Sequence, residues 1–201
     1  MAITPKSYFE ALRDYLNTHV YEVSEVENDK IVIKDKVRLP GATEDRLKKV
    51  RLQVPGEALV INLDKKNNHG NSDPLFHFLD DNSKPWAKRC DFVIFHLHRK
   101  QITAICIEFK SGHFPESLVD QMNAGVAWCR SLHSVIKHYT NIKKRMRITK
   151  FVLSCHQNPD AYLDDENKYL RRDHTIRHYL YDDIDGMSLT ELENKHVETI
   201  G

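Results

Sequence analysis

The chain has 201 residues, with 30 basic and 29 acidic side chains and a formal net charge of +1 at pH 7. This length favours one domain with a sizeable core, so we expect residues 1–201 to form a single domain. The near-zero charge excludes a globally basic nucleic-acid binder, and any nucleic-acid surface must therefore be a local patch.

Membrane and secretory signals are absent from the sequence pattern. No apolar run approaches the length of a membrane-spanning helix, and the first residues lack the layout of a signal peptide. The four cysteines are scattered, mostly on apolar elements, without a CxxC pair. We therefore expect a cytoplasmic protein with small buried thiols and no membrane partner. Assembly as a homodimer or with a partner subunit is left open.

The N-terminal part of the chain predicts a helix and then a β-hairpin. Residues 5–18 carry an amphipathic apolar stripe, and Thr4 precedes them as an N-cap. Residues 20–38 alternate as two strands around a turn at residues 27–29. This hairpin would be an addition in front of the main sheet.

The middle of the chain predicts three strands in succession. Residues 43–52 are charged and predict a short helix, whereas residues 57–63 form an apolar strand that leads into a polar loop. Two further apolar runs follow, at residues 90–97 and 103–110. Apolar residues at alternate and intervening positions are typical of strands that are covered on both faces. The short connection between the two runs predicts a hairpin with Arg99 and Lys100 in the turn.

Three charged residues interrupt this predicted hairpin. A turn at Arg99-Lys100 would place Asp91 opposite Glu108, with their Cβ atoms about 5 Å apart. Lys110 shares the face of Glu108 because side chains alternate along a strand. A carboxylate in such a run is costly to ionise without a partner, and a divalent cation would supply one. The alternative interpretation is a buried ion pair between Lys110 and one of the two carboxylates.

The C-terminal half predicts a long helix, one more strand and a helical tail. Residues 115–139 carry apolar side chains at helical spacing, and residues 148–155 form an apolar strand. The chain after residue 158 has a helical pattern, and Ser188 and Glu191 match a capping box for a last short helix. The expected fold class is therefore α/β (α+β).

The motif in these paired strands resembles that of the PD-(D/E)XK nuclease superfamily. It consists of Asp91, a spacing of sixteen residues, and then Glu108-Phe109-Lys110, with Cys90 in place of the family's proline. The element order of residues 57–155 also resembles the αβββαβ core of that superfamily, which implies a restriction-endonuclease-like mixed sheet. The resemblance implies that Asp91, Glu108 and Lys110 are catalytic. It also implies that Asp91, Glu108 and the Phe109 carbonyl hold Mg²⁺ or Mn²⁺, while Lys110 orients water or stabilises charge on the phosphate.

Further residues are candidates for the same site. Some relatives carry a glutamine at the position of Gln121 that approaches the metal or the phosphate, often with a tyrosine four residues later, where this chain has Gly125. An ordinary solvent-facing glutamine is the alternative. A third carboxylate often joins such sites, and Glu10 and Glu57 are the candidates.

Local basic residues could bind phosphates near Asp91, namely Lys84, Lys88 and Arg89. Several histidines lie close together in sequence, but none has the ligand spacing of a structural zinc site, so we interpret them as exposed or hydrogen-bonded. His174 and His178 are spaced as neighbours on a predicted helix.

The sequence therefore predicts a metal-dependent nuclease that acts on DNA or RNA, with a weak preference for a role in defence or mobile-element biology. The alternative is a catalytically silent subunit of the same fold that binds nucleic acid or a protein partner.

Overall fold

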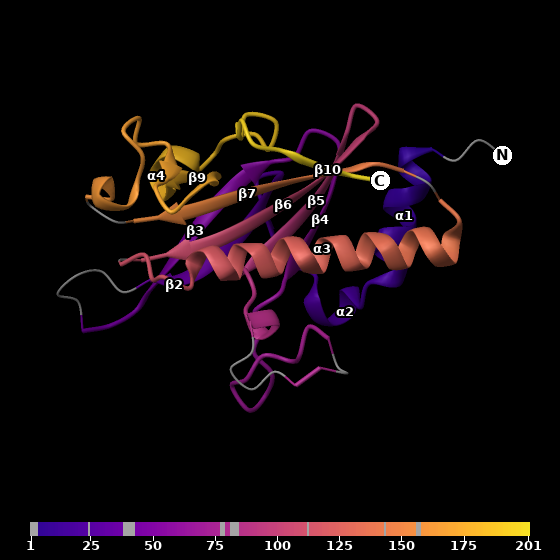
Figure 1. The fold of residues 1–201 in the computed structure, drawn as a ribbon, viewed down its shortest axis with the longest axis horizontal. Helices are drawn as coiled ribbons and strands as arrows, with labels where there is room; N and C mark the ends of the chain where they lie inside the picture. The colour runs from indigo at the N-terminus through magenta and orange to yellow at the C-terminus, as the bar shows by residue number, and fades with distance from the viewer. Residues whose placement is uncertain are drawn as a thin grey trace.

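A mixed sheet of seven strands forms the centre of the computed structural model, which describes residues 4–23, 25–37, 43–76, 79–80, 85–111, 113–142, 144–155 and 158–201 (Figure 1). Its strands are β4 (Glu57–Asn62), β5 (Phe92–His98), β6 (Gln101–Lys110), β7 (Met146–Ser154), β8 (Tyr169–Leu170), β9 (Asp173–Leu180) and β10 (Glu198–Ile200). Their order is β4-β5-β6-β7-β9-β8, with β10 also paired to β7. The pairs β6–β7 and β7–β9 are parallel and the others are antiparallel.

Two further layers cover this sheet. A smaller sheet contains β1 (Val26–Glu27), β2 (Lys30–Val37) and β3 (Arg46–Gln53). The helices are α1 (Pro5–Tyr15), α2 (Thr18–Tyr21), α3 (Leu118–Thr140) and α4 (Tyr181–Ile184), with 3₁₀ turns at Pro85–Ala87 and Asp160–Tyr162. In Figure 1, α3 crosses the strands of the central sheet on one side, and β2 and β3 lie behind them.

Each face of the central sheet has its own hydrophobic core. One cluster joins α1 and α3 to the sheet, with Phe9, Phe95 and Met122 among its buried members. The other joins the smaller sheet and α4 to the opposite face, with Leu52 and Ile107 among its members. Burial on both sides explains why β5 and β6 are almost continuously apolar.

Several sequence predictions are confirmed. The Thr4 side chain caps α1 by accepting a hydrogen bond from the Ser7 backbone N–H at 3.1 Å. Asn28 and Asp29 have positive φ angles and form the turn between β1 and β2, although β1 is shorter than predicted. The β-β-β-α-β order from β4 to β7 is also observed, in a mixed sheet. None of the described helices is long and apolar enough to cross a membrane.

The short helix predicted for residues 43–52 is wrong. Residues 46–53 instead form β3, which pairs along its whole length with β2. Val50 and Leu52 alternate into the core while the intervening lysine and arginine remain partly exposed. The charged composition favoured a helix. These residues instead pair with the edge of β2 through backbone hydrogen bonds, since strand preference depends on tertiary context.

The helical tail is also wrong. Residues 169–180 form β8 and β9, which extend the central sheet beyond the core boundary expected at residue 155. His174 and His178 therefore lie on a strand, not on a helix. The capping-box contact at Ser188 does form, because its N–H donates to Glu191 Oε2 at 2.8 Å, but it closes a turn. The same local hydrogen bonds stabilise turns and helix starts.

Acid sensitivity is expected from a buried histidine between α1 and α3. The Tyr8 hydroxyl is hydrogen bonded to Nδ1 of His133, and burial lowers the pKa of His133 to about 4. The unfolded chain binds a proton below about pH 6.5, so the free energy of unfolding should fall as the pH drops from about 6.5 to 4, by at most about 3 kcal/mol. Urea unfolding from pH 4.5 to 8 should show this loss, and His133→Asn should reduce it. His138→Asn, an exposed change on the same helix, should leave it intact.

Candidate active site

The predicted register of the β5–β6 hairpin is confirmed. Phe92 pairs with Ile107, and the chain turns at Arg99 and Lys100, which have φ angles of 47° and 65°. Positive φ at both central residues is typical of the tight turns that connect twisted strands. Asp91 lies one residue before this ladder, so it meets Glu108 at the open end of the hairpin. This register keeps Asp91 and Glu108 next to each other.

Backbone hydrogen bonds hold the two carboxylates in place. The Phe109 N–H donates to Asp91 Oδ2 at 2.7 Å, and the Asp91 N–H donates to Glu108 Oε2 at 3.1 Å. The Lys110 ammonium forms an ion pair with Glu108 Oε1. The three predicted catalytic side chains are therefore brought together, and each carboxylate has one oxygen fixed by a main-chain donor.

Burial raises the pKa values of both Asp91 and Glu108. Glu108 is only 1 % exposed, and this burial raises its pKa to about 7 against the opposing effect of Lys110. Burial also raises the pKa of Asp91 well above its usual value, and the neighbouring Glu108 raises it further. The Lys110 ammonium thus lies beside one buried carboxylate and one partly exposed carboxylate, and a further cation would stabilise their charged forms.

Asp91→Asn is expected to stabilise the metal-free protein at neutral and alkaline pH. The folded chain keeps a proton on Glu108 that the unfolded chain loses between about pH 4.5 and 7, so the free energy of unfolding falls as pH rises through this range. Removing the Asp91 charge relieves its repulsion with the Glu108 carboxylate, so the free energy of unfolding above pH 7 should rise by on the order of 1 kcal/mol. Urea unfolding in EDTA at pH 5 and 8 measures it, with exposed Asp14→Asn as the control. A less stable Asp91→Asn protein at pH 8 would contradict it.

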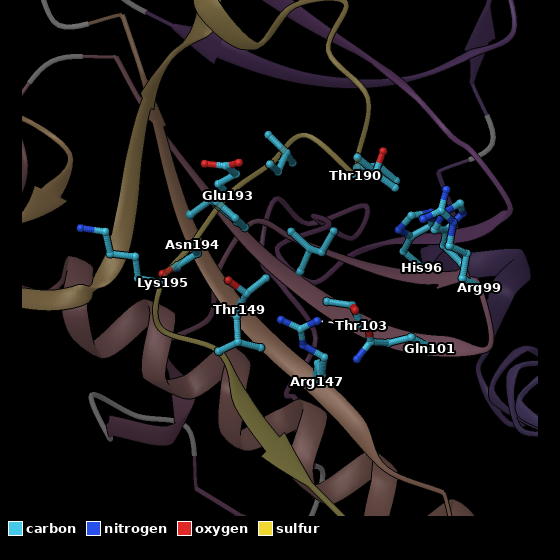
Figure 2. Close-up of a pocket in the computed structure, with 16 residues that line it drawn as sticks. His96, Arg99, Gln101, Thr103, Arg147, Thr149, Thr190, Glu193, Asn194 and Lys195 are labelled. Atoms are coloured by element: carbon cyan, nitrogen blue, oxygen red, sulfur yellow. Dashed lines mark hydrogen bonds between the residues drawn. The ribbon is translucent and has the colours of Figure 1, made fainter.

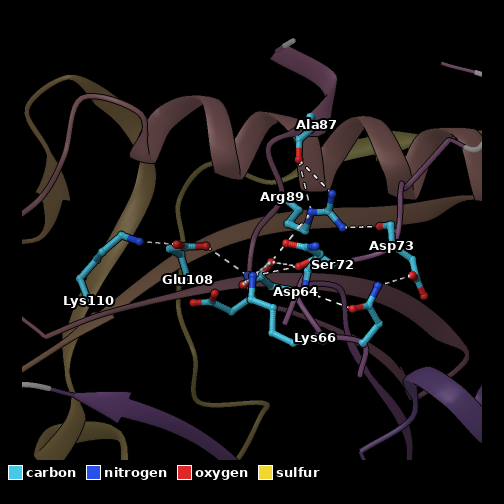
Figure 3. Close-up of polar contacts among 11 residues, drawn as sticks. Asp64, Lys66, Ser72, Asp73, Ala87, Arg89, Glu108 and Lys110 are labelled. Carbon is cyan, nitrogen blue, oxygen red and sulfur yellow. Dashed lines mark hydrogen bonds and ion pairs between the residues drawn. The ribbon is translucent and has the colours of Figure 1, made fainter. Parts of the chain in front are cut away.

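Two carboxylates that the sequence did not predict also act on the site. Asp64, just after β4, raises the pKa of Glu108 through its charge. Asp35 of β2 is partly buried and interacts electrostatically with Lys110 and with Asp91. Figure 3 shows Asp64 beside Ser72 and Lys66, whose side chains donate to it at 2.7 Å and 3.1 Å. No sequence signal identified either residue, because Asp64 opens a polar loop and Asp35 belongs to the smaller sheet.

Tyr181 is a third residue that was missed. It opens α4, is 1 % exposed, and its ring centroid lies 5.3 Å from that of Phe109. Burial raises its pKa, and the charges of Asp35 and Asp91 contribute. Its hydroxyl lies beside the Lys110 backbone without a hydrogen-bond partner among the described residues. The predicted helical tail gave no reason to place it here.

The Phe109 carbonyl faces the same side as the carboxylates. The N–H and C=O of one strand residue project toward the same neighbour, and the Phe109 N–H donates to Asp91. The next carbonyl, that of Lys110, instead accepts from the Cys155 N–H at 3.3 Å on the opposite side. The backbone therefore places the predicted oxygen ligand toward Asp91.

Gln121 lies on the face of α3 that packs against the start of β5. One turn later, Gly125 comes so close to Cys90 that an added Cβ would lie 2.4 Å from its Sγ atom. This contact explains why a bulky residue such as tyrosine cannot replace Gly125. Gln121 is half-buried rather than solvent-facing, and its Oε1 atom has no hydrogen-bond partner among the described residues.

The two predicted third carboxylates lie elsewhere. Glu10 is exposed on α1, and Glu57 is exposed opposite Leu97, at the turn end of the hairpin. Because β4 runs antiparallel to β5, Glu57 lies at one end of β5 and Asp91 lies at the other end.

The predicted phosphate-binding group is engaged in other contacts. Arg89 donates to the Asp73 carbonyl at 2.6 Å and to the Ala87 carbonyl, with a side chain only 10 % exposed. Lys88 pairs with Asp120 of α3. Lys84 lies outside the described residues. Arg89 thus positions the loop before Asp91, a structural role that the basic sequence did not indicate.

The residues present fit a hard divalent cation by their chemistry. Asp91, Glu108 and the Phe109 carbonyl offer oxygen ligands of the kind that Mg²⁺ and Mn²⁺ prefer. The raised pKa values of Asp91 and Glu108 show that their charged forms are poorly stabilised in the chain alone, and a bound cation would stabilise them. Within the described ranges, however, no three His, Cys, Asp or Glu side chains are already arranged as a metal-binding group.

Comparisons of the chain with protein families, with curated proteins and with solved structures gave no match.

Proposed function

We propose that this chain is a metal-dependent nuclease that hydrolyses phosphodiester bonds of DNA or RNA. The observation that carries the proposal is a pair of adjacent carboxylates, the buried Glu108 and the partly exposed Asp91, beside the Lys110 ammonium at the open end of an apolar hairpin. A charge arrangement that is unfavourable to the isolated fold needs a functional reason, and perturbed carboxylates of this kind are typical of active sites.

The fold supports the same proposal. The β4-β5-β6-α3-β7 order, with α2 and the smaller sheet between α1 and β4, resembles the αβββαβ order of restriction-endonuclease-like cores. The candidate site lies at the ends of β5 and β6, next to the start of α3. Smaller-sheet residues such as Asp35 would then be additions to that core.

Mg²⁺ or Mn²⁺ would be held by Asp91, Glu108 and the Phe109 carbonyl, and when bound it would polarise the scissile phosphate and acidify a water molecule. The chain itself fixes the site before substrate arrives, because the Phe109 and Asp91 N–H groups orient one oxygen of each carboxylate. Lys110, which pairs with Glu108, would donate a hydrogen bond from its ammonium group to a phosphate oxygen or to water.

One observation favours a second candidate, a catalytically silent subunit of this fold. Lys110 already pairs with Glu108, and the described residues contain no preformed three-ligand metal group. In that case the ion pair would serve the fold alone. The two candidates differ in metal binding. In a nuclease, Glu108 would leave Lys110 and coordinate a cation, whereas in a silent subunit it would stay paired with Lys110.

A cleavage assay tests the proposal. The purified chain is incubated with supercoiled plasmid, single-stranded DNA and RNA, each with Mg²⁺, Mn²⁺ or EDTA, and metal binding is followed by calorimetry. We expect cleavage of at least one substrate that depends on Mg²⁺ or Mn²⁺ and stops in EDTA. Calorimetry without any metal binding, together with no cleavage, would favour the silent subunit.

A further inference from the structure

A pocket lies at the other end of the central sheet from Asp91 and Glu108. It has a volume of about 680 Å³ and is bounded by the β5–β6 hairpin, by β7 and by the C-terminal segment from Leu189 to Val197. Figure 2 shows Arg147 and Thr149 between His96 and Arg99 on one side and Glu193, Asn194 and Lys195 on the other. Its size falls within the range of small-molecule sites, roughly 300–1,000 Å³.

This pocket is separate from the candidate active site. Its β6 residues Gln101 and Thr103 lie near the turn, whereas Glu108 lies near the other end of the same strand. They also point to the opposite face, because odd and even positions of a strand alternate. An inference about the pocket therefore does not rest on the proposed nuclease function.

Two arginines in the pocket form no ion pair with an acidic residue in the described part of the chain. Arg147 is half-buried and donates to the neutral Gln101 Oε1 at 3.1 Å, while Arg99 makes no ion pair with any described residue. By contrast, Arg130 on α3 makes a close ion pair with Glu198. A half-buried guanidinium without a carboxylate is a ready partner for an anionic ligand.

Uncommitted hydrogen-bonding groups lie beside these cations. Thr149 is 6 % exposed, and its Oγ1 atom has no hydrogen-bond partner among the described residues. His96 Nε2 and His98 Nδ1 both bond to the Pro55 carbonyl, at 2.8 Å and 3.0 Å, and their rings stack. Since that carbonyl only accepts, the bonded nitrogens carry protons, which leaves the second nitrogen of each ring for a hydrogen bond with a ligand.

We propose that this pocket binds a phosphorylated small molecule of mononucleotide size. Arg147 and Arg99 bind the phosphate, since guanidinium groups match its geometry. Thr149 adds a hydroxyl contact, and the second nitrogens of the histidine pair form hydrogen bonds with a sugar or a base. Ile105, Phe151 and Leu189 supply apolar surface for the uncharged part of the ligand.

Calorimetry in EDTA with 5′-AMP, 5′-GMP, 5′-CMP and 5′-UMP tests the proposal, with adenosine and inorganic phosphate as partial ligands. At least one mononucleotide should bind the wild-type chain, and both partial ligands should bind at least about tenfold more weakly. Arg147→Gln should weaken the mononucleotide by at least about tenfold. Thr149→Val should weaken it while keeping or raising the melting temperature, because it removes an unpartnered buried hydroxyl.

Two control variants locate the binding. Arg130→Gln removes the same kind of charge outside this pocket and should leave mononucleotide affinity unchanged. Lys110→Met should also leave it unchanged, which excludes binding of a reaction product at the candidate active site, because the Lys110 ammonium is the group that would contact a phosphate there in EDTA. The proposal is overturned if no mononucleotide binds, if inorganic phosphate binds as tightly, if Arg147→Gln and Thr149→Val have no effect, or if Lys110→Met abolishes binding.

Discussion

Glu108→Gln is expected to reduce metal-dependent cleavage by at least about 10³-fold without unfolding the protein. Glu108 is almost fully buried and supplies one of the few anionic oxygens at the site. Glutamine keeps the size of the side chain and an oxygen that can accept from the Asp91 N–H. It removes the charge, so metal affinity should fall together with the rate. Cleavage of the preferred substrate at saturating Mg²⁺ and calorimetric metal titration measure the two effects.

Glu57→Gln is the matched control for this experiment. Glu57 is an exposed carboxylate at the opposite end of the hairpin, so its loss should change neither the rate nor the metal affinity. Circular dichroism should show the same fold in both variants. Near wild-type cleavage by a folded Glu108→Gln protein would show that the site assignment is wrong.

Lys110→Met is expected to separate catalysis from metal binding. The ammonium lies against Glu108 and competes with a cation for the same carboxylate. Its loss should therefore leave metal affinity at pH 8 unchanged or higher, provided that the carboxylate is ionised. Cleavage should still fall by about 10²–10³-fold, because one hydrogen-bond donor to the reacting phosphate or water has been removed.

The measurement compares single-turnover cleavage with calorimetric metal binding at pH 8. Methionine retains the apolar stem, so the packing of a side chain that is 16 % exposed should survive. Lys6→Met, an exposed change on α1, is the control and should affect neither quantity. If Lys110→Met loses metal binding and melts at a much lower temperature, the residue serves a structural ion pair and the nuclease proposal fails.

The sequence by itself determined the hairpin that carries Asp91 and Glu108. Two apolar runs joined by a short turn can pair in few ways, and a one-residue slip would turn buried side chains outward. The register, the helix after it and the next strand were therefore predictable from residues close together in the chain. The capped start of α1 is equally local, since Thr4 and Ser7 are one turn apart.

The tertiary structure decided which further residues reach the site. Asp35, Asp64 and Tyr181 come from three separate segments, and none has a local pattern that distinguishes it from other acidic or aromatic residues. Arg89 was predicted to bind phosphate but holds backbone carbonyls.

β3 and β9 became strands because neighbouring edges, those of β2 and β7, offered unpaired backbone groups. Their sequences alone favoured helices. A strand is completed by hydrogen bonds to a partner that can be distant in sequence, whereas a helix satisfies its own backbone. Local patterns therefore describe helices and tight hairpins well, but they cannot show which distant edge a strand will join.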